Sequence, residues 1–241
     1  MSAGQPRGAD GDNRRIVYGR RQGHKLHPRQ QRLVDNVLPH VQPDLAKAGP
    51  AAWFGDDFSS YALEIGFGGG EHLAARAKAH PDTGFIGCEP FLNGVAKLLV
   101  EIDENSLKNI AVHNDDARPL MAALPDASLD RAFLLYPDPW PKKRHNKRRF
   151  ISAENLDALF RILKPDAEFL VASDIADYLD WTLAHMRAHG GFAWTAEKAD
   201  DWHQPPADWP GTRYEAKAVK AGRRPGYLRF IRRAARRAGS L

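Results

Sequence analysis

The stretch that decides the fold is Tyr61–Gly70, which reads YALEIGFGGG. A short apolar run is followed there by glycines at alternate positions, Gly66, Gly68 and Gly70. A strand that runs into a glycine-rich turn and then a helix is typical of nucleotide-binding α/β folds, because glycine lets the backbone approach a ligand closely. The sequence therefore predicts a ligand site at this glycine turn (residues 66–70).

Downstream of the glycine turn, short apolar runs alternate with helical periods. We expect strands at 61–65, 84–88, 110–113, 131–135 and 168–172, and a last antiparallel pair at 192–195 and 226–232. Helices are expected over 73–79, along the Val95–Ile102 face, over 152–164 including Leu163, and over 175–186. This alternation predicts an α/β, Rossmann-like, doubly wound and mostly parallel seven-stranded sheet with one antiparallel strand.

The regions outside the strand and helix pattern suggest three divisions of the chain. We expect a disordered tail over 1–13, a basic N-terminal extension and connector over 14–60, and one folded domain over 61–241 with a basic end. A short amphipathic helix through Leu33 and Leu38 should end at Pro39, and 42–60 should be irregular. A Trp- and Pro-rich loop is expected over 201–212.

The bulk composition favours an intracellular globular protein. The 241 residues are 43% hydrophobic, and no run reaches the roughly 18 apolar residues of a membrane span. Met1–Asp12 lacks the apolar core of a secretory signal. Cys88 is the single cysteine, so no internal disulfide can form. We therefore expect a cytoplasmic protein without a membrane partner.

The charges are unevenly distributed along the chain. Three stretches without a single acid, 14–32, 142–149 and 217–237, hold 22 of the 35 Lys and Arg residues. The remainder carries 13 cations against 30 acids. An acidic body with basic patches predicts a surface that binds a polyanion, and scattered solvated charge is the alternative.

Acidic residues stand at the ends of three successive predicted strands. Glu64 stands two residues before Gly66, where a carboxylate would repel a pyrophosphate but would suit the cationic amino-acid end of S-adenosylmethionine. Glu89 could bind both ribose hydroxyls, as in NAD sites too, and Asp116 could accept from an adenine amino group. The pattern favours S-adenosyl-L-methionine over NAD, and helix capping or simple exposure remains open for each acid.

A second unusual stretch, Tyr136–Arg149, reads YPDPWPKKRHNKRR and follows the predicted strand 131–135. Because ligands bind at the carboxyl ends of strands in open α/β sheets, Asp138 should stand at the mouth of the site. The six cations of 142–149 then provide a polyanion-binding surface directly behind it. Trp140 is expected either to stack on a base or to pack as a core indole.

Four segments together resemble the bacterial tRNA (guanine-N7)-methyltransferases: RRQG (20–23), EIGFGGG (64–70), PDPWPKKRHNKRR (137–149) and TRYE (212–215). The resemblance implies a class I methyltransferase fold over 61–241, S-adenosyl-L-methionine as cofactor, tRNA as partner, and methylation of guanine 46 in the variable loop. Two positions depart from the family pattern. Gly69 replaces a bulkier residue, and Pro141 stands where His is frequent.

The resemblance also implies a set of site residues. It places cofactor contacts at Glu64, Gly66, Gly68, Glu89, Asp116 and Asp138. It places tRNA or guanine contacts at Lys142, Asp174, Thr212 and Glu215. The cations expected to hold the tRNA backbone are Arg20, Arg21, Lys143, Arg144, Lys147 and Arg148.

The expected chemistry assigns Asp138 as the catalytic residue. Guanine N7 carries a lone pair and no proton, so alignment matters more than a strong base. A carboxylate beside the base would stabilise the positive charge that moves onto the purine, or would orient the base through its N–H edge. Asp174 and Glu215 could accept from guanine N1–H and its exocyclic amine, and an N-cap role is the alternative for Asp174.

Other functions remain open at this level. An NAD-dependent oxidoreductase could share the fold, and a non-catalytic RNA-binding protein could share the basic surface. The histidines show no metal-ligand spacing with Cys88, so no catalytic metal is expected. The sequence does not distinguish a monomer from a homodimer.

Overall fold

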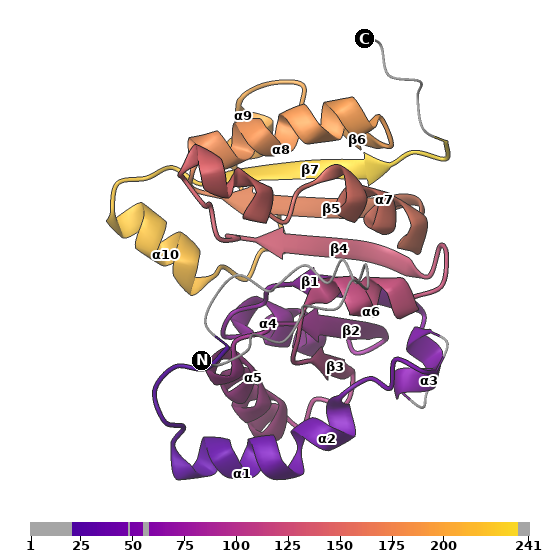
Figure 1. The fold of residues 1–241 in the computed structure, drawn as a ribbon, viewed down its shortest axis with the longest axis vertical. Coiled ribbons are helices and arrows are strands. Elements are labelled where there is room, and N and C mark those ends of the chain that lie inside the picture. Colours follow the sequence, from indigo (N-terminus) through magenta and orange to yellow (C-terminus); the bar gives the residue numbers. More distant parts are fainter. Residues whose placement is uncertain (1–20, 48, 55–57, 236–241) are drawn as a thin grey trace, which may run out of the picture.

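A seven-stranded sheet in the order β3-β2-β1-β4-β5-β7-β6 runs through the molecule (Figure 1). The computed structural model describes residues 21–47, 49–54 and 58–235. The strands are β1 (Ser60–Ile65), β2 (Thr83–Cys88), β3 (Ile110–His113), β4 (Leu129–Leu135), β5 (Leu163–Ser173), β6 (Phe192–Trp194) and β7 (Gly226–Arg232). The pairs from β3 to β5 are parallel, and β7 is antiparallel to both β5 and β6. This is the predicted doubly wound sheet with one antiparallel strand.

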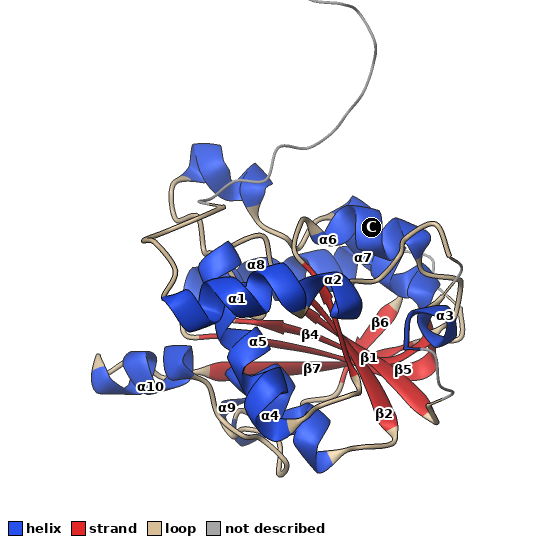
Figure 2. Ribbon diagram, turned by 90° about the horizontal axis from the view of Figure 1, so that it is seen from below, coloured by secondary structure: helices blue, strands red, loops and turns tan. Residues whose placement is uncertain are grey.

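Helices connect the strands and cover both faces of the sheet (Figure 2). In the part of the chain that the structure describes they are α1 (Pro28–Asn36), α2 (Leu38–Val41), α3 (Pro50–Phe54), α4 (Glu71–Ala79), α5 (Leu92–Asn105), α6 (Ala117–Ala123), α7 (Ala153–Ile162), α8 (Ala176–His189), α9 (Asp200–His203) and α10 (Arg213–Lys220). A 3-10 helix, η1 (Lys143–Arg148), follows β4. None of these helices is long and apolar enough to cross a bilayer.

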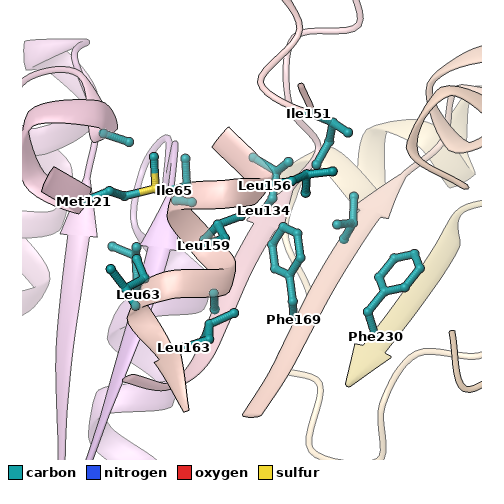
Figure 3. Close-up of a cluster of buried hydrophobic side chains, with 14 of the residues drawn as sticks. Leu63, Ile65, Met121, Leu134, Ile151, Leu156, Leu159, Leu163, Phe169 and Phe230 are labelled. Atoms are coloured by element: carbon teal, nitrogen blue, oxygen red, sulfur yellow. The ribbon is translucent and has the colours of Figure 1, made fainter. Parts of the chain in front are cut away.

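Each face of the sheet has its own hydrophobic core. One core joins α6, α7 and α8 to the sheet through residues such as Met121, Leu159 and Phe169 (Figure 3). The other joins α1, α2, α4 and α5, and the predicted Val95–Ile102 stripe of α5 is buried in it. Because side chains alternate across a strand, Leu63 and Ile65 enter the first core, and Ala62 enters the second. The side chain of Glu64 is therefore directed toward α4.

Most of the predicted strands and long helices are confirmed, because their signals are local. Ser152 caps α7 by accepting a hydrogen bond from the Asn155 amide, as expected of an N-cap serine. The C-cap of α8 is Gly190 in a left-handed conformation, which glycine adopts without strain. The parallel sheet therefore follows largely from hydrophobic periodicity.

Some element predictions were wrong. Leu163 belongs to β5 rather than to the preceding helix, because it pairs with Leu129 at the start of a longer strand. Pro39 lies in the first turn of α2, where its missing N–H costs nothing, and does not end that helical region. Helix α6 was missed, α3 interrupts the expected connector, and α9 interrupts the expected loop.

The proposed division into tail, extension and domain stays a prediction. The tail over 1–13 and Arg20 lie outside the described residues. The described part of the extension packs on the domain, because Leu33 and Leu38 belong to the core that contains α4 and α5. The extension is therefore partly integrated into the fold.

Candidate cofactor and nucleic-acid site

A cavity of about 480 Å³ opens where the strand order reverses between β1 and β4. In open α/β sheets the crevice at such a switch point is the usual ligand site. The segments after β1, β2, β3 and β4 all contribute to its lining, and so does the start of α10. The sequence-predicted residues that line it are Gly66, Gly68, Glu89, Asp116, Asp138, Trp140, Lys147 and Arg148.

The glycine turn forms the floor of the cavity. Gly66, Gly68 and Gly70 all have positive φ, which L side chains rarely adopt. A Cβ atom at Gly66 would meet nothing within 4 Å, so the backbone there is open to a ligand. A Cβ atom at Gly94 would lie 2.0 Å from the Gly68 carbonyl oxygen, so α5 can approach the turn only through a glycine.

Glu89 is held beside this floor by backbone amides. Gly68 donates to Glu89 Oε2 at 2.8 Å, and Phe91 donates to Oε1 at 2.9 Å. Burial raises the pKa of Glu89, although the two amide hydrogen bonds favour the ionised form. The carboxylate is thus fixed at the end of β2, where Glu89 lines the cavity.

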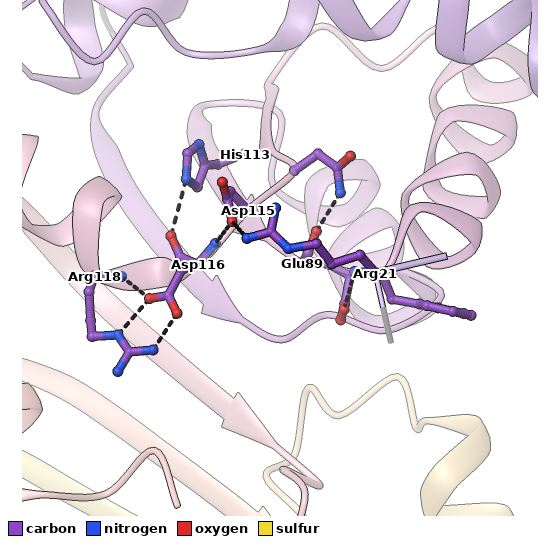
Figure 4. Close-up of polar contacts among 8 residues, drawn as sticks. Arg21, Glu89, His113, Asp115, Asp116 and Arg118 are labelled. Atoms are coloured by element: carbon purple, nitrogen blue, oxygen red, sulfur yellow. Dashed lines mark hydrogen bonds and ion pairs between the residues drawn. The ribbon is translucent and has the colours of Figure 1, made fainter. Parts of the chain in front are cut away.

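Asp116 is fixed by the first turn of α6 (Figure 4). As the N-cap, it accepts from the Arg118 amide at 2.8 Å and from Arg118 Nε at 2.7 Å. Burial opposes ionisation of this carboxyl, but the hydrogen bonds and charge of Arg118 outweigh it and hold the pKa of Asp116 below its usual value. Arg21, expected at the tRNA backbone, instead donates to Asp115 Oδ1 at 2.9 Å on the cavity rim.

Glu64 is not among the residues that line the cavity, and its contact with the cofactor stays a prediction. Its side chain is 2% exposed, and Oε2 lies 2.7 Å from Nδ1 of His72, which is 3% exposed. The pleat of β1 directs this carboxylate toward α4, where His72 is its partner.

Asp138 stands at the mouth of the cavity, as predicted. It lines the cavity while remaining exposed to solvent, and surrounding protein raises the pKa of its carboxyl. Within the described residues it has no hydrogen bond or ion pair. Tyr136 and Trp140 on either side have φ of 49° and 41°, in the left-handed region that non-glycine residues seldom adopt. Such strain is frequent at functional loops.

Trp140 lies in this loop rather than in the core. It lines the cavity, and the Arg148 guanidinium lies 4.9 Å from its ring centroid. His145 approaches the indole edge-on, with ring centroids 6.0 Å apart. The core-indole alternative is therefore wrong, and one part of the ring is already covered by a cation.

The basic stretch 142–149 is not uniform. Lys142, Lys143, Arg144 and Lys147 are exposed and take part in none of the ion pairs among the described residues. Arg149 is buried instead, with Nε donating to the Pro139 carbonyl at 2.9 Å and the guanidinium paired with Asp177. The expectation of six polyanion-binding cations was therefore wrong for Arg149, which fastens the loop to α8.

Acid-free stretches in sequence are not acid-free in space. Cations of the basic stretches form ion pairs with distant acids: Arg21 with Asp115, Arg29 with Asp103 and Glu104, Arg149 with Asp177, Arg223 with Asp174, and Arg229 with Glu168. The polyanion surface is accordingly smaller than the sequence count implies.

The predicted substrate residues of the C-terminal half lie outside the cavity lining. Thr212 and Glu215 form a capping box at the start of α10, and Glu215 Oε2 also accepts from the Trp209 indole at 2.6 Å. Asp174 pairs with Arg223 at 2.5 Å. The N-cap alternative for Asp174 is wrong, because the N-cap of α8 is Ile175.

Comparison with known proteins identifies the family. The sequence model of a family described as "Putative methyltransferase" matches residues 59–225. A tRNA (guanine-N(7)-)-methyltransferase of Agrobacterium fabrum is 54% identical over 219 residues, which cover 90% of this chain and 94% of the relative. This chain belongs to the tRNA (guanine-N7)-methyltransferase family. A second relative, from Mesorhizobium japonicum, is 52% identical over the same shares of both chains.

Solved structures agree with this family's class I fold. The 16S rRNA methyltransferase KamB superposes with a TM-score of 0.58 at 14% identity, covering 78% of this chain and 95% of that one. A 16S rRNA (adenine(1408)-N(1))-methyltransferase variant from Catenulisporales acidiphilia, solved with cosubstrate SAM, gives 0.50 at 13% identity, covering 76% and 88%. At these identities the likeness concerns the fold alone.

Several cavity residues of this methyltransferase were not predicted as site residues: Phe91, Asn93, Lys97, Arg118, Tyr136, Arg213 and Tyr214. Arg213 and Tyr214 belong to the quoted TRYE segment, so the signal for them was present. Their place over the glycine turn depends on how α10 docks, which no local pattern indicates. The described residues hold no group of three or more His, Cys, Asp or Glu side chains that could bind a metal ion.

Proposed function

We propose that the protein transfers a methyl group from S-adenosyl-L-methionine to N7 of guanine in tRNA, at guanine 46 of the variable loop. One observation carries the proposal. The glycine turn, Glu89, Asp116 and Asp138 line a single cavity, although they follow four different strands. Membership of the tRNA (guanine-N7)-methyltransferase family supports both the reaction and the substrate class.

The cavity suits an adenosine-containing cofactor. The open backbone at Gly66 provides a cradle, and the fixed oxygens of Glu89 can accept from two ribose hydroxyls. Asp116 lies one strand further, where an adenine amino group would reach it. When bound, the cofactor supplies a methyl group activated by a sulfonium. Glu64, which is paired with His72 of α4, remains a candidate for direct cofactor contact.

The base would enter beside Asp138, which lines the cavity and is exposed to solvent. The guanine N7 lone pair needs no general base, so the protein mainly has to align N7 with the methyl carbon and sulfur for direct displacement. Alignment of this kind contributes on the order of 7–11 kcal/mol. As positive charge moves onto the purine, the Asp138 carboxylate stabilises it. No covalent intermediate with the protein is required.

The tRNA would approach over the β4 loop. Lys142, Lys143, Arg144 and Lys147 are exposed beside the cavity mouth and can bind phosphates. Trp140 and Arg148 lie at the mouth, where a base could stack. Asp174 and Glu215 remain candidate acceptors for the guanine edge, and each would have to exchange a present partner for the base.

The test is incubation with labelled S-adenosyl-L-methionine and unmodified tRNA, followed by mapping of the methylated nucleotide. The proposal expects one N7-methylguanine, at position 46. Binding of tRNA without methyl incorporation would instead support a non-catalytic RNA-binding protein. A rise in melting temperature with NAD but not with S-adenosylhomocysteine would support an oxidoreductase, because a ligand stabilises the state that binds it.

A further inference from the structure

A cation lies directly on the glycine turn. A Cβ atom at Gly69 would stand 1.8 Å from Nη2 of Arg213, and one at Gly68 would stand 3.8 Å from the same nitrogen. Arg213 also lines the cavity, and its positive charge acts to lower the pKa of Glu89, against the effect of burial. The guanidinium therefore belongs to the cofactor end of the cavity and not to the exposed basic loop.

Helix α4 fixes the position of this guanidinium. Arg213 Nε lies 3.2 Å from Oε1 of Glu71, the first residue of α4. Trp209, just before α10, lies against the ring of His72, with centroids 5.0 Å apart. Asp208 is paired with Arg76, one turn further along α4. Because α4 begins at the glycine turn, these contacts hold Arg213 in register with the turn.

Arg213 has unused hydrogen-bonding capacity. Its Nε is buried, and the approach of Glu71 does not give it a hydrogen bond. Among the described residues, no hydrogen bond is made by either Nη group. A guanidinium has five N–H donors in a planar fork that matches a carboxylate. The arrangement leaves such a fork directed at the floor of the cavity.

The strand order indicates which part of the cofactor would meet this fork. Asp116 follows β3, Glu89 follows β2 and the glycine turn follows β1, and these strands are adjacent in that order. A cofactor with adenine at Asp116 and ribose at Glu89 therefore places its amino-acid end over the glycine turn. That end carries a carboxylate, which the nearby acids Glu89 and Asp138 would repel.

We propose that Arg213 binds the carboxylate of the amino-acid end of S-adenosyl-L-methionine. This inference rests on the proposed function and adds a cofactor contact to it. Before the cofactor binds, Glu71 balances the charge of Arg213 at 3.2 Å. The cofactor carboxylate then accepts the free N–H groups. Arg213 thereby selects cofactors with an intact carboxylate.

The test compares two ligands that differ in that carboxylate alone. S-adenosyl-L-methionine and its decarboxylated form are titrated by calorimetry against wild type and Arg213→Gln. Charge-assisted hydrogen bonds of this kind correspond to about 10- to 100-fold in affinity. Wild type should bind the intact compound more tightly by about that factor. Arg213→Gln should lose this preference while its affinity for the decarboxylated compound stays the same.

Lys217→Gln is the matched control, because it removes a cation one turn further along α10 that does not line the cavity. It should retain the wild-type preference, and melting curves without ligand show whether each variant folds. Equal losses for both ligands in Arg213→Gln, or a loss for tRNA alone, would overturn the proposal. If wild type binds neither compound, the proposed function fails as well, which separates the two failures.

Discussion

The two walls of the cavity are built differently. The wall formed by the ends of β1, β2 and β3 carries acids that local donors already hold, Glu89 by two backbone amides and Asp116 by Arg118. The wall formed by the loop after β4 carries Asp138, which has a raised pKa and no hydrogen bond within the described residues. The acids of the first wall already have hydrogen-bond partners, whereas Asp138 in the second wall has none among the described residues.

The first wall is thus suited to binding the cofactor, and the second wall is suited to the methyl-transfer step. Preorganised acceptors suit a cofactor that binds in one orientation, because no reorganisation opposes binding. An unpaired carboxylate on a strained loop destabilises the free protein, and such strain concentrates where function requires it. We therefore expect changes in the first wall to alter cofactor affinity and changes in the second to alter turnover.

The largest expected effect is the loss of turnover when Asp138 is replaced. Asp138→Asn removes the carboxylate that would stabilise positive charge on the purine, and we expect kcat to fall by about 100- to 1000-fold. The affinity for S-adenosylhomocysteine should change far less. Single-turnover methyl transfer and calorimetry on the same preparation measure both. Turnover near the wild-type value, with folding and cofactor binding intact, would remove Asp138 from the chemistry.

The next effect concerns the close approach of α5 to the glycine turn. In Gly94→Ala, the added methyl group would meet the Gly68 carbonyl at 2.0 Å, so the backbone of the turn must shift. Overpacking of this kind costs about 1–3 kcal/mol in the free energy of unfolding, and cofactor affinity should fall too. Gly222→Ala is the control for lost stability alone, because its φ of 70° makes alanine costly there although Gly222 does not line the cavity. Equal cofactor affinity in the two variants would contradict the claim that the close approach of α5 to the glycine turn shapes the cofactor site.

The third prediction compares the effects on stability of the buried Arg149 and of Arg144, an exposed cation of the same loop. Arg149→Met leaves the Pro139 carbonyl without its donor and frees the loop from Asp177. We expect the free energy of unfolding to fall by about 1–3 kcal/mol, as measured in urea. Arg144→Met, at an exposed position, should change it by less than about 0.5 kcal/mol. Equal losses of unfolding free energy in the two variants would mean that Arg149 does not hold the basic loop against α8.

We expect the exposed cations of the basic loop to contribute to the salt dependence of tRNA binding. Replacing Lys143 and Arg144 together by Gln should reduce the slope of log K against log salt by about 2, because each cation neutralises one phosphate of the bound tRNA. Filter binding at several salt concentrations measures this slope. An unchanged slope would place the tRNA elsewhere on the surface.

The smallest effect is on stability. Because the surrounding protein partly desolvates the Asp138 carboxylate and raises its pKa, the folded protein holds its proton more tightly than the unfolded chain does. Ionisation therefore costs stability as pH rises above the ordinary pKa of the carboxyl. Asp138→Asn should melt slightly higher than wild type at neutral pH, and the difference should shrink as pH falls through the raised pKa. A lower melting temperature for Asp138→Asn would indicate a structural role.

The same contrast explains how much the sequence could predict. Strand positions, the buried stripe of α5 and the place of Asp138 depend on local periodicity and on the rule for strand ends, so they were recovered. The pairing of Glu64 with His72 was not predicted, because both faces of β1 are buried and the sequence does not show which face meets His72.

Long-range packing accounts for the remaining errors. Arg149 has the same side chain as Arg148, yet it is buried because α8 passes behind the loop. Arg213 was quoted within a motif, but its contact with the glycine turn depends on the docking of α10 against α4. Helix α6 is only seven residues long, too short for a clear period. These features arise from contacts between segments distant in sequence.

The most direct measurement of the central claim uses two tRNA transcripts, one with guanosine and one with 7-deazaguanosine at position 46. The second lacks only the N7 lone pair at which the methyl group should arrive. With wild-type protein and labelled S-adenosyl-L-methionine, we predict about one methyl group per guanosine transcript, since one N7 is aligned, and none in the 7-deaza transcript. Equal incorporation into both transcripts would contradict the account.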